Sequence, residues 1–447
     1  MHDSIAAPAA VIFGLDPMWF AAILFILTYA VIMTERINRA VVALLAAGLM
    51  IFGGVLNQEA AIRGVDFNTI GLLIGMMVIV AITRQSGVFQ YLAIWSAKKV
   101  KADPWGVLLM LSLVTAVASA LLDNVTTVLL IIPVALLITE ELRVSAYPYL
   151  FSMIFASNIG GTSTLIGDPP NIMIGSAVGL TFNDFVVNLA PVIVVVMAAT
   201  MVPIYLIWGR KLKATDDDRR RVMEFNERQA ITDPALLKKC LAVIAAVILG
   251  FVFAHSLGVE AATIAMFGAA ALLLLQCWPH DAEEQSKHIH HAFTEVEWIT
   301  IFFFVGLFIV VHGLDSTGLL KLMANQVLEL TGGELTATAM TILWASAVLS
   351  AFVDNIPFVA TMIPLIKSMA PTFGGPEGLM PLWWTLSLGA CLGGNGTLIG
   401  ASANLVVAGF AERAGQPIRF IQYTLVAFPI MLLSIFICMY YLEWRYL

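Results

Sequence analysis

Two stretches decide the fold of this protein: SALLDNVTTVLLIIPVAL at residues 119–136 and SAFVDNIPFVATMIPLIK at residues 350–367. Asp123 and Asp354 hold the same place in the two stretches, and each is followed by an asparagine. Each Asp-Asn step lies in the middle of an apolar run that is too long for one membrane span, which needs about 20 residues. We therefore predict two re-entrant helical hairpins with Asp-Asn tips, at residues 105–139 and 337–370.

A further motif follows each hairpin: GGTSTLIGDPPN at residues 160–171 and GGNGTLIGASAN at residues 393–404. Glycines allow tight backbone and prolines end helices, so both motifs predict a broken helix, over residues 148–179 and 380–411. The motifs recur in the same order and at nearly the same spacing, which coincidence does not explain. Inverted repeats with broken helices are typical of secondary transporters, whose binding site lies near the middle of the membrane.

The composition places the chain in a membrane. Of its 447 residues, 60% are hydrophobic and 12% are charged, whereas soluble proteins carry about 25% charged residues. The net charge of −7 offers no basic surface for nucleic acid, and four single cysteines predict neither a disulfide scaffold nor a zinc site. We therefore expect an all-α polytopic membrane protein that is not an enzyme, with no cofactor, no metal site and no nucleic-acid partner.

Hydrophobic runs and the positions of Lys and Arg predict the topology. About ten spans remain once the hairpins are set aside, and most of the 23 Lys and Arg residues then lie on the inner side. The opening MHDSIAAPAA lacks the basic start of a signal peptide. We expect the N-terminus to lie outside and the location to be the inner (plasma) membrane. The predicted organisation is an N-terminal scaffold at 1–66, a first inverted repeat at 67–208, a cytoplasmic basic linker at 209–239 and a second repeat at 240–447.

The basic linker has two interpretations. It mixes acidic and basic residues between the two repeats. Such a segment is usually a solvated connector that fixes topology, and a docking site is the alternative.

Polar residues inside a membrane are costly, so those in the motifs are the candidates for binding. Asp123-Asn124 and Asp354-Asn355 lie at the hairpin tips, and the two aspartates are candidates for proton coupling. Asp168 corresponds to Ala401 in the other copy. This inequality marks Asp168 as a specialised carboxylate, either a proton carrier or a cation ligand. The N-cap of a helix that begins at the neighbouring prolines is the plainer interpretation, and the two can hold together. The broken helices add neutral donors and acceptors, namely Asn158, Thr162, Thr164, Asn171, Asn395, Thr397 and Asn404.

The runs DNVTTVLLIIP, SNIGGTSTLIGDPPN, DNIPFVATMIP and LGACLGGNGTLIGASAN resemble the arsenite permease and P-protein group of the ion transporter superfamily. The resemblance implies a central site between inverted repeats and elevator-like movement of a transport domain. It also implies antiport of arsenite or antimonite against protons, while relatives exchange anions, or sodium against protons. Carried over to this sequence, the implied site comprises Asp123, Asn124, Asn158, Thr162, Asp168, Asn171, Asp354, Asn355, Asn395, Thr397 and Asn404.

Proton-coupled efflux of arsenite or antimonite is therefore the first functional hypothesis. Arsenous acid is an uncharged trihydroxide that suits Asn, Thr and Ser side chains, and the motifs contain no Arg or Lys to clamp a carboxylate. Sodium–proton exchange and anion transport stay open, and an ion channel or an intramembrane aspartyl protease explains the repeat less well. The expected partners are a small solute, protons and the lipid bilayer. A soluble ATPase and a second copy of the chain are further candidates.

Overall fold

The computed structural model describes residues 14–34 and 36–447, which form helices and turns without a strand. The expectation about a signal peptide falls on residues outside this description. In chain order the α-helices are α1 (Pro17–Met33), α2 (Arg39–Phe52), α3 (Gln58–Arg63), α4 (Phe67–Arg84), α5 (Val88–Lys99), α6 (Pro104–Leu121), α7 (Asn124–Glu141), α8 (Tyr147–Thr162), α9 (Pro169–Val178), α10 (Phe182–Ile207), α11 (Asp216–Met223), α12 (Pro234–Leu257), α13 (Ala261–Cys277), α14 (Ala282–Thr294), α15 (Trp298–Ser316), α16 (Leu319–Leu330), α17 (Leu335–Phe352), α18 (Asn355–Lys367), α19 (Met380–Gly393), α20 (Ser402–Arg413) and α21 (Phe420–Tyr446). The short 3-10 turns are η2 (Gly209–Lys211), η3 (Glu227–Ala230), η4 (Glu377–Leu379) and η5 (Gly394–Gly396).

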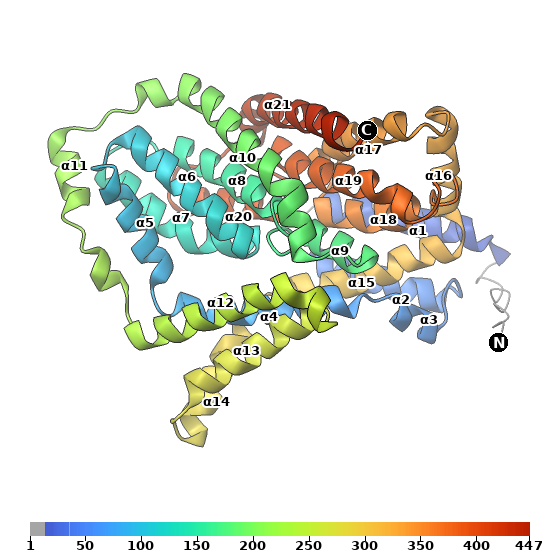
Figure 1. Ribbon diagram of the computed structural model, residues 1–447, viewed down its shortest axis with the longest axis horizontal. Coiled ribbons are helices and arrows are strands. Elements are labelled where there is room, and N and C mark those ends of the chain that lie inside the picture. The colour runs from blue at the N-terminus through green and yellow to red at the C-terminus, as the bar shows by residue number, and fades with distance from the viewer. Residues whose placement is uncertain (1–13, 35) are drawn as a thin grey trace.

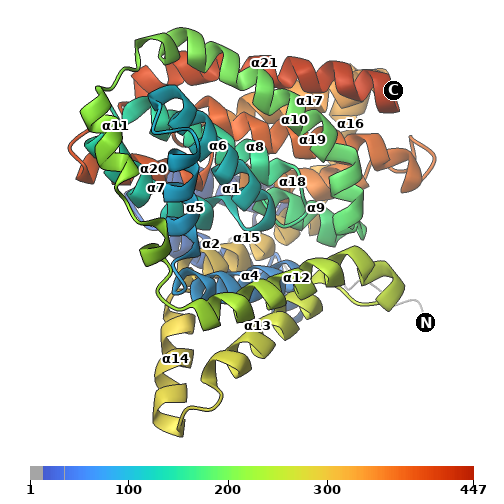
Figure 2. The same ribbon diagram turned by 60° about the vertical axis from the view of Figure 1, so that its left-hand side comes forward.

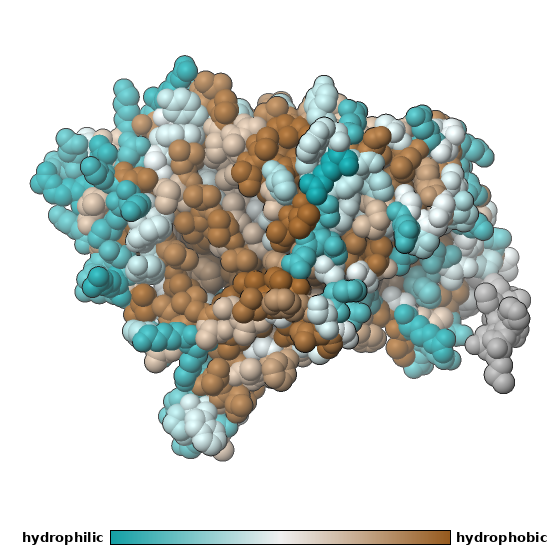
Figure 3. All heavy atoms as spheres, viewed as in Figure 1, coloured by the Kyte–Doolittle hydropathy of each residue, from teal (hydrophilic) through white to brown (hydrophobic). Residues whose placement is uncertain are grey.

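Eight of the described helices are long and apolar enough, by length and composition, to cross a membrane: α4, α6, α7, α10, α12, α15, α17 and α21. On the face seen in Figure 3, hydrophobic residues gather over the middle, and hydrophilic residues gather toward the two ends of the long axis. The ten predicted spans correspond to α1, α2, α4, α10, α12, α13, α15, α21 and the two broken helices. The predicted all-α polytopic fold is thus confirmed.

α6 and α7 form the first hairpin. Asp123 caps α7 by accepting the backbone N–H three residues further on, at 2.8 Å. The far ends of both arms lie against α11, where Arg221 Nε is 3.1 Å from Glu141 Oε2 and Arg219 Nη2 is 4.0 Å from Asp103 Oδ1. The chain therefore returns to the end of the molecule from which it entered, as a re-entrant hairpin requires.

α17 and α18 form the second hairpin, and Asp354 caps α18 by accepting the N–H of Ile356 at 3.0 Å. The two ends of this hairpin also lie together, because a Cβ placed on Gly333 would lie 3.6 Å from the side chain of Thr372. α6 and α7 occupy one half of the long axis and α17 and α18 the other (Figures 1 and 2). The two hairpins thus enter from opposite ends, and their tips meet in the middle.

Each hairpin is followed by a broken helix. The first is interrupted between Thr162, where α8 ends, and Pro169, where α9 begins. The second is interrupted between Gly393, where α19 ends, and Ser402, where α20 begins. Pro169 occupies the first position of its helix, where the N–H that proline lacks has no helical partner. Both breaks lie where the glycine-rich motifs predict them.

The two repeats make the same contacts at equivalent positions. The hydroxyl of Ser119 on α6 donates to the carbonyl of Ser157 on α8 at 2.6 Å. In the second repeat, Ser350 on α17 donates to the carbonyl of Ala390 on α19 at 2.7 Å. Each hairpin is therefore fastened to its broken helix by the same buried hydrogen bond.

The helices that precede the hairpins are packed in matching pairs as well, α4 on α13 and α15 on α2. A Cβ on Gly75 of α4 would lie 2.7 Å from the carbonyl carbon of Ala265, and one on Gly306 of α15 would lie 2.6 Å from that of Ala43. Only glycine permits this approach of two backbones. α2 and α15 therefore form one tightly packed unit beside the hairpins.

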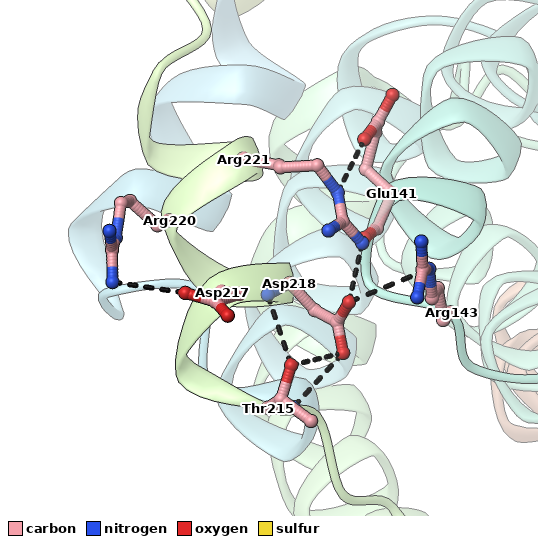
Figure 4. A network of polar contacts seen from close by, with 7 residues as sticks. All are labelled: Glu141, Arg143, Thr215, Asp217, Asp218, Arg220 and Arg221. Atoms are coloured by element: carbon pink, nitrogen blue, oxygen red, sulfur yellow. Dashed lines mark hydrogen bonds and ion pairs between the residues drawn. The ribbon is translucent and has the colours of Figure 1, made fainter.

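The linker between the repeats docks on the first hairpin (Figure 4). In α11, Asp218 accepts a hydrogen bond from Thr215 at 2.6 Å and pairs with Arg221, which in turn reaches Glu141 at the end of α7. The hydrogen bond from Thr215 is the main cause that lowers the pKa of Asp218 to about 2. α11 is thus anchored to the first hairpin through Asp218 and Arg221, while Asp217 and Arg220 stay exposed, and its role as connector or docking site stays a prediction.

Candidate functional site

Asp168 lies at the centre of the molecule, between the two hairpin tips. It is fully buried, and its Oδ1 accepts hydrogen bonds from Asn124 of the first tip at 3.3 Å and from Asn355 of the second at 3.4 Å. Its Oδ2 has no hydrogen-bond partner among the residues that the structure describes. Asp168 occupies the N-cap position of α9, but within the described chain its side chain makes no capping hydrogen bond. Asp168 thus holds the predicted N-cap position, but the capping role of its side chain is not seen in the described chain.

Buried amides connect the two repeats behind Asp168. Asn158 on α8 donates to the side-chain oxygens of Asn395 at 3.0 Å and Asn404 at 2.9 Å, both in the second repeat. Its own side-chain oxygen accepts from Asn124 at 3.0 Å. The amide of Asn158 thus links the first tip to the second broken helix, and all four amides are buried.

The remaining predicted polar residues donate hydrogen bonds to backbone carbonyls. Thr164 and Thr397 donate to carbonyls near the hairpin tips, at 2.6 Å to Ala120 and 2.5 Å to Ala351. Asn171 donates to the carbonyls of Thr162 and Thr164, as Asn404 does to those of Gly394 and Thr397. Thr162 donates to the carbonyl of Asn158, one helical turn back. These side chains hold the breaks in shape.

Asp354 has a cationic partner from outside the repeats' motifs. Arg39, the first residue of α2, donates from Nη1 to Asp354 Oδ2 at 2.8 Å and to Ser402 Oγ at 2.7 Å. Its guanidinium carbon lies 5.0 Å from the centre of the Phe303 ring on α15. The tip of the second hairpin is therefore tied by an ion pair to the α2–α15 unit.

A small cavity joins these groups. Its volume is about 20 Å³, room for roughly one water molecule. Four of the predicted residues line it: Asp123, Asn124, Asp168 and Asn355. Sequence reasoning missed three others that line it, Arg39, Glu297 and Thr300. Arg39 is the one cation among its described lining residues, against three carboxylates, so the cavity is acidic overall.

A larger cavity of about 330 Å³ adjoins the small one. Arg39, Val125, Glu297 and Ser402 line both. Tyr29 and Asp354 line the larger cavity only. Arg39 and Glu297 thus stand where the two spaces meet.

The motifs contain no Arg or Lys, but in the folded protein α2 supplies the cation Arg39 to the site from outside them. Nothing local in the sequence distinguishes Arg39 from other cations at helix starts. Glu297 does carry a signal, since Glu297 and Thr300 repeat Asp66 and Thr69 at the same offset of 231 residues that separates the hairpin tips.

Comparison with known proteins agrees with this architecture. A family model described as "Citrate transporter" matches residues 29–389. An uncharacterized transporter of Mycobacterium tuberculosis is 42% identical over 430 residues, covering 95% of this chain and 98% of that protein. A 46 kDa membrane protein of Mycobacterium leprae is 40% identical, covering 96% and 98%. The P protein of Homo sapiens is 32% identical and covers 93% of this chain, which spans 58% of the P protein.

Two solved structures share the fold. The YdaH transporter of Alcanivorax borkumensis superposes with a TM-score of 0.57 at 14% identity, covering 96% of this chain and 98% of that one. MtrF of Neisseria gonorrhoeae, described as an antimetabolite efflux pump, gives 0.55 at 10% identity, covering 97% and 95%. At these identities the likeness concerns the fold alone.

Proposed function

The chain belongs to the citrate transporter family of membrane transporters, and we propose that it is a secondary active transporter in which Asp168 carries the coupled proton. The observation that carries the proposal is the geometry of Asp168. This carboxylate is fully buried, is held by both hairpin tips and keeps one oxygen without a partner. A buried carboxylate left without a partner is costly, so it binds a cation or takes up a proton.

A proton suits this position better than sodium does. The amides of Asn124 and Asn355 present N–H groups to Asp168, whereas a hard metal cation needs several oxygen ligands. Oδ2 is one acceptor without a described partner, on a residue that lines a cavity with room for about one water molecule. A single proton delivered through water needs no more than this.

A carboxylate anion is the first substrate that we propose. Arg39 lines both cavities, and a guanidinium can bind a carboxylate through two parallel hydrogen bonds. The match to a family described as citrate transporters supports the same class. Antiport of arsenite or antimonite against protons is the second candidate, favoured by the neutral amides of Asn124, Asn158, Asn395 and Asn404.

We also propose which end of the protein lies on the inner side of the membrane and which helices form the transport domain. The basic segment at 209–239 is the largest cluster of Lys and Arg, which favours an inner location for the α11 end in the plasma membrane. The hairpins and broken helices form the candidate transport domain, and the α2–α15 unit belongs to the candidate scaffold.

Flux in proteoliposomes tests the proposal. Purified protein is reconstituted with a pH-sensitive dye inside, and citrate, arsenite, antimonite, sodium and chloride are supplied in turn. We expect one solute to move together with protons and Asp168→Asn to abolish the proton movement. Asp217→Asn, which alters an exposed acid of α11, is the control and should behave like the wild type. Full proton-coupled flux in Asp168→Asn would refute the role of Asp168.

A further inference from the structure

In the part of the chain that the structure describes, the side chain of Glu297 does not cap the helix that follows it, whereas its counterpart in the first repeat, Asp66, does. Asp66 caps α4 by accepting the N–H groups of Asn68 at 3.0 Å and Thr69 at 3.2 Å. Glu297 stands at the same place before α15, but within the described chain it makes no capping hydrogen bond. Its Oε2 accepts from Thr300 Oγ1 at 3.2 Å instead. The exchange of Asp for Glu thus frees this carboxylate from capping.

The freed side chain stands at the junction of the two cavities. Glu297 lines both the larger cavity of about 330 Å³ and the small one of about 20 Å³ that ends at Asp168. Asp168 lines the small cavity, and its buried Oδ2 lacks a described partner. A carboxylate on a residue that lines both cavities is placed to pass a proton from the larger one to the small one that Asp168 lines.

We propose that Glu297 relays protons between the larger cavity and Asp168, an inference that rests on the proposed role of Asp168. In the loading step, Glu297 takes a proton from a hydronium ion in the larger cavity and leaves a water molecule there. It gives that proton to the water that the small cavity accommodates, and this water gives one to Asp168 Oδ2. Glu297 then ends as the carboxylate and Asp168 as the neutral acid, and release runs the same steps in reverse.

The charges around Glu297 determine how it exchanges protons. Arg39 of α2 and Asp123 of the first tip line the small cavity together with Glu297, so a cation and a second acid share its surroundings. Asp354 already neutralises much of the Arg39 charge through the ion pair at 2.8 Å. Thr300 on α15 donates to the carboxylate from the same helix. Glu297 is therefore flanked by opposing charges, as a group that must both accept and give up a proton requires.

Separate measurements of exchange and net proton movement test the relay. In citrate-loaded proteoliposomes, and with arsenite if citrate does not move, Glu297→Gln should keep exchange of labelled for unlabelled solute. It should lose most of the net solute movement that is driven by a pH gradient. Glu295→Gln is the control, because Glu295 is two residues away and pairs with Arg84 at 2.7 Å. It should match the wild type in both assays.

The outcomes separate the relay from the proposed function. If Asp168→Asn abolishes proton movement while Glu297→Gln keeps the wild-type rate and pH profile, the relay is wrong and the proposed function stands. If Asp168→Asn has no effect, the proposed function fails first. Infrared difference spectra across a pH titration give a readout without transport. A carboxyl band present in the wild type and in Glu295→Gln should disappear in Glu297→Gln, and its persistence would overturn the proposal.

Discussion

Arg39 and Asp354 lie 315 residues apart in the sequence and form an ion pair of 2.8 Å in the fold. The pair joins the start of α2 to the tip of the second hairpin. Their side chains are 25% and 13% exposed, so the pair is largely removed from solvent. This contact makes the position of the hairpin tip depend on a helix that lies outside both hairpins.

Removing one partner of this pair should destabilise the protein. Arg39→Gln leaves the Asp354 carboxylate without its cation, which should cost about 2 kcal/mol, between the values for exposed and fully buried pairs. The apparent melting temperature in detergent checks this, and the double variant Arg39→Gln/Asp354→Asn should recover part of the loss. Arg63→Gln, whose pair with Glu59 is largely exposed, is the control with little expected effect. Additive losses in the double variant would contradict the prediction.

Replacing Thr164 in the first repeat or Thr397 in the second should lower the stability of the protein by a similar amount. Thr164→Val and Thr397→Val each remove a hydroxyl that bonds a backbone carbonyl at a hairpin tip. Each variant should lose about 1–2 kcal/mol, because the carbonyl is left unsatisfied. Thr341→Val, which loses a hydroxyl in an exposed part of α17, should lose much less. A large effect of one motif threonine and none of the other would argue against structural equivalence.

Close packing of α15 on α2 predicts a strong effect of a single methyl group. Gly306→Ala would place its Cβ 2.6 Å from backbone atoms of Ala43, so the two helices must move apart. Overpacking of this kind typically costs about 1–3 kcal/mol. Gly48→Ala on α2 meets no atom of the described chain within 4 Å and should be neutral or slightly stabilising. Thermal unfolding of the two variants compares them directly.

The docking of α11 should weaken only in strong acid. The pKa of Asp218 is about 2 in the folded protein, below its ordinary value of 3.8. Because this pKa is lowered, the ionised Asp218 carboxylate contributes fully to the stability of the docked α11 above about pH 4. That contribution is lost as the pH falls toward 2 and the carboxylate is protonated. The docking of α11 has to be measured in acid, because it can re-form once the protein is returned to neutral pH. Hydrogen exchange of α11, measured directly between pH 2 and 6, is therefore the test. The exchange rate, corrected for its intrinsic pH dependence, should rise below pH 4, and Asp218→Asn should already be fast at pH 6.

The two tip asparagines should affect transport without abolishing the fold. Asn124→Ala and Asn355→Ala each remove one donor to Asp168 and a group that lines the small cavity. We expect each variant to raise the apparent KM for the transported solute in the proteoliposome assay. Asn183→Ala, which removes an exposed side chain that bonds Val252, is the control. An unchanged KM in both tip variants would exclude these amides from the binding site.

Much of this architecture could be predicted because the motifs are long and occur twice. Asp123 and Asp354 mark the hairpin tips, and the glycine-rich motifs mark the helix breaks. At both places the backbone conformation is set by nearby residues, namely capping aspartates, glycines and prolines. The role of individual polar groups was less predictable. Thr164 and Asn171 look like ligands in sequence, yet they bond backbone, because a broken helix leaves carbonyls that need donors. Arg39 could not be found, since only the tertiary packing of α2 on α15 brings it to the cavity.

The shared acceptor of the two hairpin tips has a wider consequence. Asn124 and Asn355 come from hairpins that enter from opposite ends, yet both donate to the same oxygen of Asp168. Any change in the charge of that carboxylate therefore alters the strength of both hydrogen bonds in one event. Both hairpin tips can therefore respond to a single protonation of Asp168, without a signal that travels through the rest of the protein.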